Sequence, residues 1–464
     1  MHNNIQEDLK LFNILVQEFL TSEKNQPTAN YIPAEQIKNK VDLKLKDKGI
    51  SKTRFQELIR QVLLKTPKTS SKLFFNQLFG GRHSKAVLGD LLTVFLNNSM
   101  ATYKIAGLQV NIEKQVIKKV CQLIGYPKNS GGTFPTGGSM CNFMSLVMAR
   151  DKKNKEIKEL GYNNQKMVVY TSESAHYSIS KNTSFIGIGK KNIRYIKSND
   201  KGAINTLLLE QQIKKDIKNN FTPTYLNATA GTTVMCAFDD IRKLVKICKN
   251  YKIWLHLDGA FGGSVIFSKK HKILVEGINK TDSFCFNAHK TLGAPLSTSV
   301  LVVKNRSNLL YSFNNEAKYL YQTENKEYNL GRTSFECGRR NNALKFWTLW
   351  KSIGTNGLEK MVDYEFSLAD YARSYISSNK DYILYSFDNS LSICFNYKNI
   401  NPKKLCTKLY EQNKLLVGYG EFSNNTFIRL VTINSQNTKE DILNFFVILE
   451  KFAQKLLDSK NQNE

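Results

Sequence analysis

The 464-residue sequence contains no run of roughly eighteen apolar residues, the length that a helix needs to cross a bilayer. We therefore expect no transmembrane span. The N-terminus also lacks the basic start, the apolar stretch and the small-residue cleavage site of a secretory signal. Secretion is therefore not expected either.

Cysteine is present but never in the spacing of a metal or disulfide motif. None of the eight cysteines belongs to a Cys-x-x-Cys pair, and most have apolar neighbours. This pattern argues against both a zinc site and a disulfide framework. We expect no metal ligands, mostly buried free thiols, and a location in the reducing cytoplasm.

Acidic residues are scarce relative to basic ones, 39 against 67, so the formal net charge is +28. Such a charge raises the possibility of binding to nucleic acid or an anionic membrane. The lysines are spread along the chain, however, and many stand beside asparagine, which argues against a specific nucleic-acid site. The densest stretch, Lys38 to Lys48, also contains Asp42 and Asp47, and we interpret it as a solvated amphipathic helix. A basic surface can still attract an acidic substrate.

The length and composition, with 41% apolar and 23% charged residues, are typical of a soluble globular protein with two or three domains, or one large α/β domain with attachments. Residues 1–100 are expected to form an N-terminal helical segment, with helices over 9–19 and 86–96. Residues 101–353 are expected to form the large domain, and residues 354–464 a smaller α+β domain.

Short apolar segments alternate with helical ones between about residues 101 and 305, and this pattern predicts a mainly parallel sheet. The expected strands are 167–170, 193–196, 224–227, 253–257, 283–286 and 300–303. In open sheets of this kind, ligands bind at the carboxyl ends of the strands. A polar, tyrosine-rich segment at about 319–333 interrupts the pattern and is expected to be a mobile loop. Helical periodicity returns over 341–353 and 358–377, and strands are expected at 391–395 and 426–431.

Two of these strand ends carry a matched pair of reactive groups. Asp258 closes the strand at 253–257, and Lys290 follows the strand at 283–286 directly after His289. A pyridoxal phosphate (PLP) enzyme needs an amine to hold the cofactor aldehyde and an acid to pair with the ring nitrogen. Lys290 and Asp258 supply both groups.

Three further segments fit a phosphate-bearing aromatic cofactor but are ambiguous when taken singly. The glycine-rich segment 131–140 precedes a helix to about Arg150 and can present backbone N–H groups to a phosphate, although such turns are also ordinary connectors. His176 can lie flat against a cofactor ring, or can simply satisfy local hydrogen bonds at a helix start. Residues 227–233 can be a plain exit from a strand.

Together the segments form a recognisable series: GGTFPTGG, TSESAHYS, NATAGTTV, WLHLDGAFGGS, NAHK, ECGRR and ALKFWTLWKSIGTNGLE. This series closely resembles the group II PLP-dependent decarboxylases, and its nearest branch resembles the glutamate, cysteine sulfinate and aspartate decarboxylases. The similarity runs from about Phe74 to Arg429. It implies an α/β protein of PLP fold type I, similar to aspartate aminotransferase, with a large mainly parallel-sheet domain and a smaller C-terminal α+β domain.

The resemblance implies Lys290 as the Schiff-base lysine, Asp258 as partner of the pyridine nitrogen, and His176 as the residue stacked on the ring. Other implied cofactor contacts are Ser139, Met140, Cys141, Thr233, Ala260 and His289. Family members usually have serine where this chain has Cys141, and because a thiol is a weaker donor than a hydroxyl, phosphate binding there is expected to use backbone N–H groups. Ala288, Gly259 and Phe261 are milder departures from the family pattern.

A loop tyrosine is implied as the group that protonates the substrate carbon, often across a dimer interface in this family. Tyr328 is the best match, and Tyr319 and Tyr321 are alternatives because the loop is shorter than in the animal glutamate enzymes. A tyrosine simply exposed on the surface is the competing interpretation. The resemblance also implies a homodimer with its active site at the interface.

The implied substrate contacts are Arg429, which grips a carboxylate, Gln77 and Phe79. The glutamate enzymes tend to have a small residue at the position of Phe79, and the cysteine sulfinate branch a bulky aromatic one. Bulk at this position shortens the pocket. We therefore expect decarboxylation of L-aspartate to β-alanine or of cysteine sulfinate to hypotaurine, with glutamate decarboxylation to 4-aminobutyrate as the alternative.

Other functions stay open at this point. An aminotransferase or a phosphate-ester lyase would use the same cofactor, and a basic nucleic-acid-binding protein could be built on a disabled enzyme scaffold. The presence of Lys290, Asp258, His176 and Arg429 argues against a disabled site.

Overall fold

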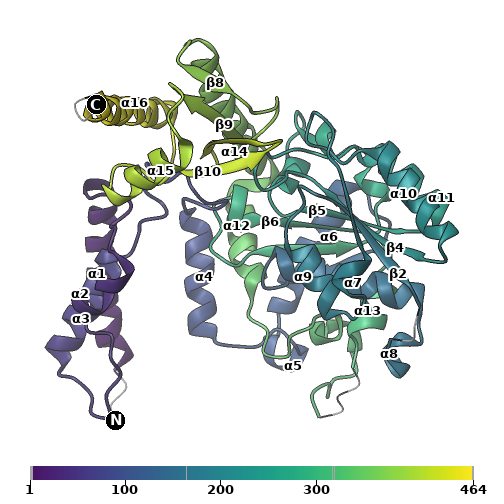
Figure 1. Ribbon diagram of the computed structural model, residues 1–464. Helices are drawn as coiled ribbons and strands as arrows, with labels where there is room; N and C mark the ends of the chain where they lie inside the picture. The colour runs from purple at the N-terminus through teal and green to yellow at the C-terminus, as the bar shows by residue number, and fades with distance from the viewer. Residues whose placement is uncertain (1–3, 163–164, 316, 318, 462–464) are drawn as a thin grey trace. The chain divides into compact units, whose positions relative to one another are not determined.

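The structure is a computed structural model that describes residues 4–162, 165–315, 317 and 319–461, and these form two compact units (Figure 1). The larger unit contains residues 82–370 and 386–392. The smaller unit contains residues up to 81, residues 371–385 and the residues from 393 onward, so it unites the two ends of the chain. The expected division of the chain at residues 100 and 353 stays a prediction.

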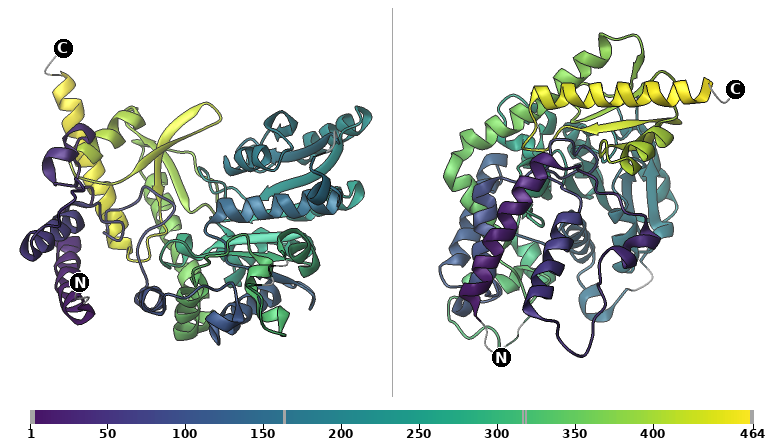
Figure 2. Two further views of the ribbon diagram at one scale, coloured as in Figure 1. Left: turned by 90° about the horizontal axis from the view of Figure 1, so that it is seen from below. Right: turned by 90° about the vertical axis from the view of Figure 1, so that its left-hand side faces the viewer.

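A seven-stranded sheet forms the centre of the larger unit in the described part of the chain (Figure 2). The neighbouring pairs from β6 to β3 are parallel, whereas β7 runs antiparallel to both β6 and β1. The expected mainly parallel sheet is therefore confirmed. The strand order is β1 (Gly131–Thr133), β7 (Ser299–Val303), β6 (Ser283–Asn287), β5 (Trp254–Gly259), β4 (Thr222–Thr229), β2 (Met167–Ser172) and β3 (Ile193–Ile196).

Nearly every residue of β2, β4, β5, β6 and β7 is buried, as expected for strands covered by helices on both faces. The register places Thr229 beside Asp258, and Asp258 beside Cys285. The carboxyl ends of β4, β5 and β6 therefore lie together, which brings Asp258 near the segment that carries Lys290.

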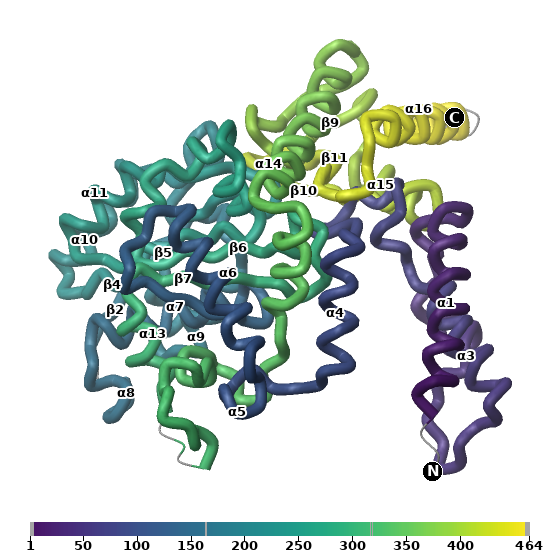
Figure 3. The backbone as a smooth tube through the Cα atoms, turned by 180° about the vertical axis from the view of Figure 1, so that it is seen from behind, coloured from purple at the N-terminus to yellow at the C-terminus, as the bar shows by residue number. Residues whose placement is uncertain are grey.

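Helices cover both faces of this sheet. Helix α7 packs on β4 to β7 together with α9, while α10 and α11 lie on the opposite face against β4 (Figures 1 and 3). Helix α11 begins at an Asp240 cap, whose side chain accepts the backbone N–H of Lys243. The helices of the larger unit are α4 (Ser84–Leu96), α5 (Tyr103–Ala106), α6 (Gln109–Ile124), α7 (Gly138–Lys153), α8 (Ile157–Leu160), α9 (Ser178–Phe185), α10 (Thr206–Lys218), α11 (Ile241–Tyr251), α12 (Ala288–Thr291) and α13 (Arg306–Phe313).

One long helix, α14 (Asn342–Ser377), contains both helices expected over 341–353 and 358–377. It is kinked at Gly354, whose φ of 67° is not helical. Short 3-10 turns fill several connections: η1 (Ala34–Gln36), η2 (Lys190–Asn192), η3 (Gly263–Phe267), η4 (Lys272–Val275), η5 (Ile278–Lys280), η6 (Lys326–Tyr328) and η7 (Leu330–Thr333).

The smaller unit contains a four-stranded sheet and the helices at both ends of the chain. Its strand order is β10 (Gly418–Phe422), β11 (Asn425–Val431), β9 (Ser392–Tyr397) and β8 (Tyr382–Leu384). Helices α1 and α3 run side by side (Figure 3). The helices are α1 (Ile5–Asn25), α2 (Ile37–Lys40), α3 (Lys52–Lys65), α15 (Pro402–Glu411) and α16 (Lys439–Asn461).

Backbone hydrogen bonds tie the N-terminal part of this unit to its C-terminal part. Phe75 N donates to Leu416 O over 2.8 Å, and Val431 N donates to Phe75 O over 3.1 Å. The segment around Phe75 thus lies between the strand region after Leu416 and the end of β11. This places Gln77 and Phe79 in the same unit as Arg429.

The prediction of a helix over Lys38 to Lys48 is wrong. Only α2 is helical there, and residues 42–48 have no helix. The apolar residues Val41, Leu43 and Leu45 alternate with charged ones, so they do not form one face of a helix, and Leu45 is fully exposed. Three strands were not predicted from the sequence: β1 and β8, each only three residues long, and β10.

Across the part of the chain that the structure describes, no helix combines the length and the apolar character required to cross a membrane.

Candidate active site

A cavity of about 200 Å³ lies at the carboxyl ends of β4, β5 and β6, next to the start of α7. Six of the predicted site residues line it together: Ser139, His176, Thr233, Asp258, Ala260 and Lys290. The other lining residues are Gly138, Asn142, Tyr177, Thr229, Gly231, Phe261 and Asn287. These predicted residues from separate parts of the sequence thus line one cavity of the larger unit.

Asp258 is buried at the end of β5, with 4% of its surface exposed. Its Oδ1 accepts the backbone N–H of Ala260 at 3.0 Å, and its Oδ2 accepts Nδ2 of Asn142 at 2.7 Å. These bonds hold both carboxylate oxygens. A buried carboxylate held in this way presents a fixed negative charge to a cationic group in the cavity.

Asn142 is the end of a chain of hydrogen bonds that all point the same way. Trp254 Nε1 donates to Ser283 Oγ, and the Ser283 hydroxyl in turn donates to Nδ1 of His256. Nε2 of His256 then donates to Oδ1 of Asn142 at 3.0 Å. Burial lowers the pKa of His256 to about 4, so the ring is neutral and carries its proton on Nε2. Asn142 therefore has only its NH2 group to turn toward Asp258.

The NH2 group of Asn142 also connects Asp258 with His176. It donates to Ser178 Oγ at 3.0 Å, and that oxygen lies 2.8 Å from Nδ1 of His176. The backbone N–H of Ser178 donates to the same Nδ1, so this nitrogen is an acceptor. Burial lowers the pKa of His176, the Asp258 charge opposes this shift, and Lys290 adds to it. The His176 ring is therefore neutral and fixed in orientation at neutral pH.

Helix α7 begins at the cavity, with Gly138 and Ser139 in its wall. The N–H groups of Met140 and Cys141 already donate to Gly137 O, each at 3.0 Å. Gly138 and Ser139 occupy the first helical positions, whose N–H groups have no acceptor within a helix and suit an anion. A Cβ on Gly138 would lie 3.0 Å from Ala260 Cβ and 3.1 Å from Asn287 Nδ2, so glycine permits this close approach.

Three predicted cofactor contacts do not line the cavity. Cys141 is buried in the core with Cys285, and Met140 packs against the same core. His289 is bound through Nδ1, which accepts Thr298 N–H at 2.9 Å, and burial lowers its pKa to about 4. These three residues support the walls from behind, and their contact with cofactor stays a prediction.

The predicted proton donor and substrate residues lie elsewhere. Tyr328 lines a different cavity of the larger unit, where its ring packs against Tyr103 with centroids 5.4 Å apart. Tyr319 is 81% exposed. Gln77, Phe79 and Arg429 belong to the smaller unit. The roles expected for these residues stay predictions.

The residues around the cavity fit PLP. The aldehyde would be held by Lys290, the ring nitrogen by Asp258, one ring face by His176, and the phosphate by the start of α7. Asn287 gives independent evidence that a polar partner is missing. It lines the cavity, and its Oδ1 is buried and accepts no hydrogen bond from the described residues. A cofactor donor or a bridging water would satisfy this oxygen.

Comparison with known proteins identifies the family. Residues 33–398 match the model of the pyridoxal-dependent decarboxylase conserved domain. The chain belongs to this family. It is a PLP-dependent amino-acid decarboxylase, as the motif series implied, and PLP is its cofactor.

Individual relatives cover almost the whole chain. It is 32% identical to the acidic amino acid decarboxylase GADL1 of Xenopus tropicalis over 93% of its length and 89% of that protein. It is 33% identical to the cysteine sulfinic acid decarboxylase of Rattus norvegicus, over 96% of its length and 95% of that protein. The crystal structure of mouse CSAD superposes with a TM-score of 0.91 at 30% identity, covering 97% of this chain and 98% of that one. The expected fold type I architecture is thereby confirmed.

The family assignment gives each cavity group a chemical task. When bound, PLP supplies an electron sink for the electron pair that the departing carboxyl group leaves behind. Asp258 would keep a proton on the ring nitrogen, because a buried carboxylate favours a cation beside it. Lys290 would supply the amine that holds the cofactor until the amine of the substrate takes its place. The neutral ring of His176 would cover one cofactor face and exclude water from it.

Sequence reasoning missed Asn142, Ser178, His256 and Asn287. One signal was available for Asn142: it stands four residues after Gly138, so a helix starting at the glycine-rich turn places both on one face. The partners of Asn142 are distant in sequence, at positions 178, 256 and 258, and no local pattern indicates them.

Proposed function

We propose that this enzyme decarboxylates an acidic L-amino acid, with L-aspartate or cysteine sulfinate as its substrate. The observation that carries the proposal is the similarity, over more than nine tenths of the chain, to one relative named for acidic amino acids and another named for cysteine sulfinic acid. Phe79, which would shorten the pocket, supports these four-carbon-sized acids over glutamate.

The proposed substrate residues are joined within the smaller unit. Arg429, on β11, donates from Nη2 to the backbone oxygen of Asn76 at 2.9 Å. Gln77 is the next residue, and it lines a groove of about 620 Å³ together with Phe79. The Phe79 ring lies 5.9 Å from that of Phe74. Arg429 would bind the substrate and Phe79 would limit the length of the substrate. The segment 76–79, which Arg429 contacts, would therefore connect both effects.

We further propose that the enzyme is a homodimer and that Tyr328 acts on the substrate held by the partner subunit. The support is a stripe on α4 in which Leu88, Leu92 and Phe95 are 51%, 43% and 57% exposed. These positions share one helix face, and exposed apolar stripes of this kind mark contact surfaces. A second copy of the chain would cover the stripe.

We propose a cytoplasmic location. The support is that all eight cysteines are free thiols, which fits a reducing compartment.

The substrate is tested by loading the purified protein with PLP and measuring CO2 release from aspartate, cysteine sulfinate and glutamate separately, with the amine products identified. We expect the highest kcat/KM with aspartate or cysteine sulfinate. A preference for glutamate would refute the short-pocket argument while leaving the enzyme class intact. CO2 release from none of the three would overturn the acidic-substrate proposal.

A further inference from the structure

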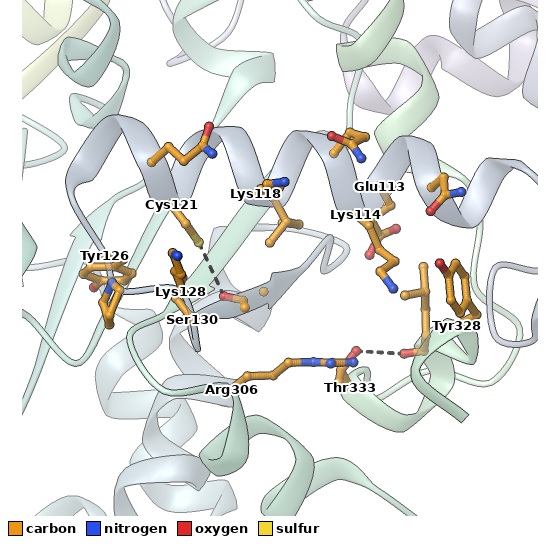
Figure 4. Close-up of a pocket in the computed structure, with 18 residues that line it drawn as sticks. Glu113, Lys114, Lys118, Cys121, Tyr126, Lys128, Ser130, Arg306, Tyr328 and Thr333 are labelled. Atoms are coloured by element: carbon orange, nitrogen blue, oxygen red, sulfur yellow. Dashed lines mark hydrogen bonds between the residues drawn. The ribbon is translucent and has the colours of Figure 1, made fainter. Parts of the chain in front are cut away.

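A second cavity, of about 710 Å³, lies in the larger unit between helix α6, strand β1 and the segment from η6 to η7 (Figure 4). None of its lining residues belongs to the cofactor cavity. Its volume is within the range of small-molecule sites, roughly 300–1,000 Å³. It is therefore large enough to hold a ligand of its own.

Basic side chains surround this cavity. Lys114 and Lys118 come from α6, Lys128 from the turn before β1, and Arg306 from the start of α13. Figure 4 shows Lys114 pointing down from α6 and Arg306 extending along the opposite wall toward Thr333. The positive groups thus converge from three parts of the chain on one space.

The cationic side chains are only weakly balanced by neighbouring carboxylates. Among the described lining residues the one carboxylate is Glu113, and it is paired with the buried guanidinium of Arg339. Glu327, outside the lining, attracts Lys114. Burial lowers the pKa of Lys114, the attraction of Glu327 opposes this shift, and repulsion by Arg306 adds to it, so an anion bound beside Lys114 and Arg306 would ease the repulsion between them.

Arg306 is held in place by close packing, unlike an ordinary surface cation. A Cβ on Gly131 would lie 2.8 Å from Cγ of Arg306 and 3.1 Å from its Cδ. Glycine at this position therefore lets the Arg306 stem lie directly on β1. The backbone N–H of Arg306 also donates to Asn129 O at 3.0 Å. An arginine whose stem is held in this way loses less side-chain freedom when its guanidinium binds an anion.

The walls between the cations are partly apolar and aromatic. Ile117, Cys121 and Tyr126 are buried, and the Tyr328 ring closes one end, with Nζ of Lys114 lying 3.8 Å from its centroid. Such walls exclude water and strengthen the attraction between a ligand charge and the cations.

We propose that this cavity binds an oligophosphate anion, either free or as part of a nucleotide, at a site separate from the cofactor site of the same subunit. The phosphates would be held by Arg306 and Lys114, with Lys118 and Lys128 adding long-range attraction at the rim. An oligophosphate carries several negative charges in one small group, and these can pair with the several positive side chains around the cavity.

The test is calorimetric titration of the PLP-loaded protein with inorganic pyrophosphate and, separately, with ADP. Loading with PLP first occupies the cofactor phosphate site. We expect one site per chain, with affinity that falls as salt is raised. Binding of ADP at least tenfold tighter than pyrophosphate would show that the base contributes, and equal affinities that the phosphates suffice. The absence of binding by both would overturn the proposal.

Three variants separate this site from the general positive charge of the protein. Arg306→Gln and Lys114→Gln each remove one charge and keep most of the side-chain stem, and each should weaken binding about tenfold or more. Lys119→Gln is the matched control, because Lys119 is exposed on the same helix but does not line the cavity. Equal weakening by all three would show non-specific attraction and contradict the site. The visible absorbance of bound PLP shows that each variant is folded.

Discussion

Nδ2 of Asn142 donates a 2.7 Å hydrogen bond to Oδ2 of Asp258, and both residues are almost completely buried. The direction of this bond is set by His256, which occupies the amide oxygen of Asn142. The group proposed to pair with the cofactor nitrogen is therefore oriented by a chain of donors that starts at Trp254 and involves strands β5 and β6 and helix α7.

Asn142→Ala should lower kcat at saturating PLP by about tenfold to hundredfold, because a hydrogen bond to a buried charged group is worth about 1.5–3 kcal/mol. PLP affinity, measured by fluorescence titration, should fall as well. Ser145→Ala is the control, since Ser145 is buried on the same helix and bonds Tyr225 instead. Equal losses in both variants would indicate general damage to α7.

The free energy of unfolding should fall as the pH drops below 6.5, because two buried histidines stay neutral in the folded protein. Burial lowers the pKa of His256 and His289 to about 4 each, so the unfolded chain binds protons that the folded chain does not. Each histidine would cost about 1.6 kcal/mol between pH 6.5 and 5. Asp239, whose pKa burial raises to about 6, acts in the opposite direction.

Comparing the wild type with His256→Gln cancels the contribution of Asp239. In urea unfolding, the loss of stability from pH 7.5 to 5 should be about 2 kcal/mol smaller in the variant. The same pH dependence in both proteins would show that His256 is not a buried neutral group.

Phe79→Ala should raise kcat/KM for glutamate relative to aspartate by about tenfold or more, because one methylene in a fitted pocket is worth ~1–3 kcal/mol. CO2 release with the two substrates in parallel measures this ratio. Leu443→Ala, an exposed residue of the same unit on α16, should leave the ratio unchanged. An unchanged ratio in Phe79→Ala would mean that this side chain does not limit substrate length.

Leu92→Glu on α4 should convert the proposed dimer to monomer, as measured by light scattering during gel filtration, because a buried unpaired charge opposes association. Leu160→Glu on α8 is the control, since Leu160 is 76% exposed outside the α4 stripe. A dimer that survives Leu92→Glu would place the interface elsewhere.

Subunit mixing tests the role of Tyr328 across the interface. Lys290→Ala and Tyr328→Phe should each be nearly inactive alone. Unfolded together and refolded, they should regain about a quarter of wild-type activity, since about half of the dimers are mixed and each has one intact site. No recovery would place Tyr328 and Lys290 of one subunit in the same site, whereas full activity of Tyr328→Phe alone would exclude Tyr328 from the reaction.

Local patterns in the sequence were sufficient to predict most strands of the large sheet and the residues at their ends. Strand β3 has the expected bounds, and β2, β4 and β6 contain the expected segments, because each is a short apolar run between polar turns. Lys290 and Asp258 were recognisable since each directly follows or closes such a run. Strand β1 was missed because its three residues gain their structure from pairing with β7.

Long-range contacts explain what the sequence did not reveal. Asn142 meets Asp258 only after the sheet and α7 pack together, over 116 positions of sequence. The pairing of Phe75 with Leu416, which gathers both chain ends in one unit, is equally invisible in local composition. The helix predicted over Lys38 to Lys48 is absent because a pattern of charged residues does not by itself provide an apolar face that packs against the rest of the protein.

Lys290 is proposed to hold the cofactor, and the roles of the other cavity residues depend on this assignment. The PLP-loaded enzyme should be reduced with sodium borohydride, digested, and mapped by mass spectrometry, because reduction fixes the cofactor to the amine that holds it. We predict a single phosphopyridoxyl adduct on Lys290, with no adduct and no CO2 release in Lys290→Ala. An adduct on another lysine, or undiminished CO2 release by Lys290→Ala, would contradict the assignment of Lys290 as the residue that holds PLP.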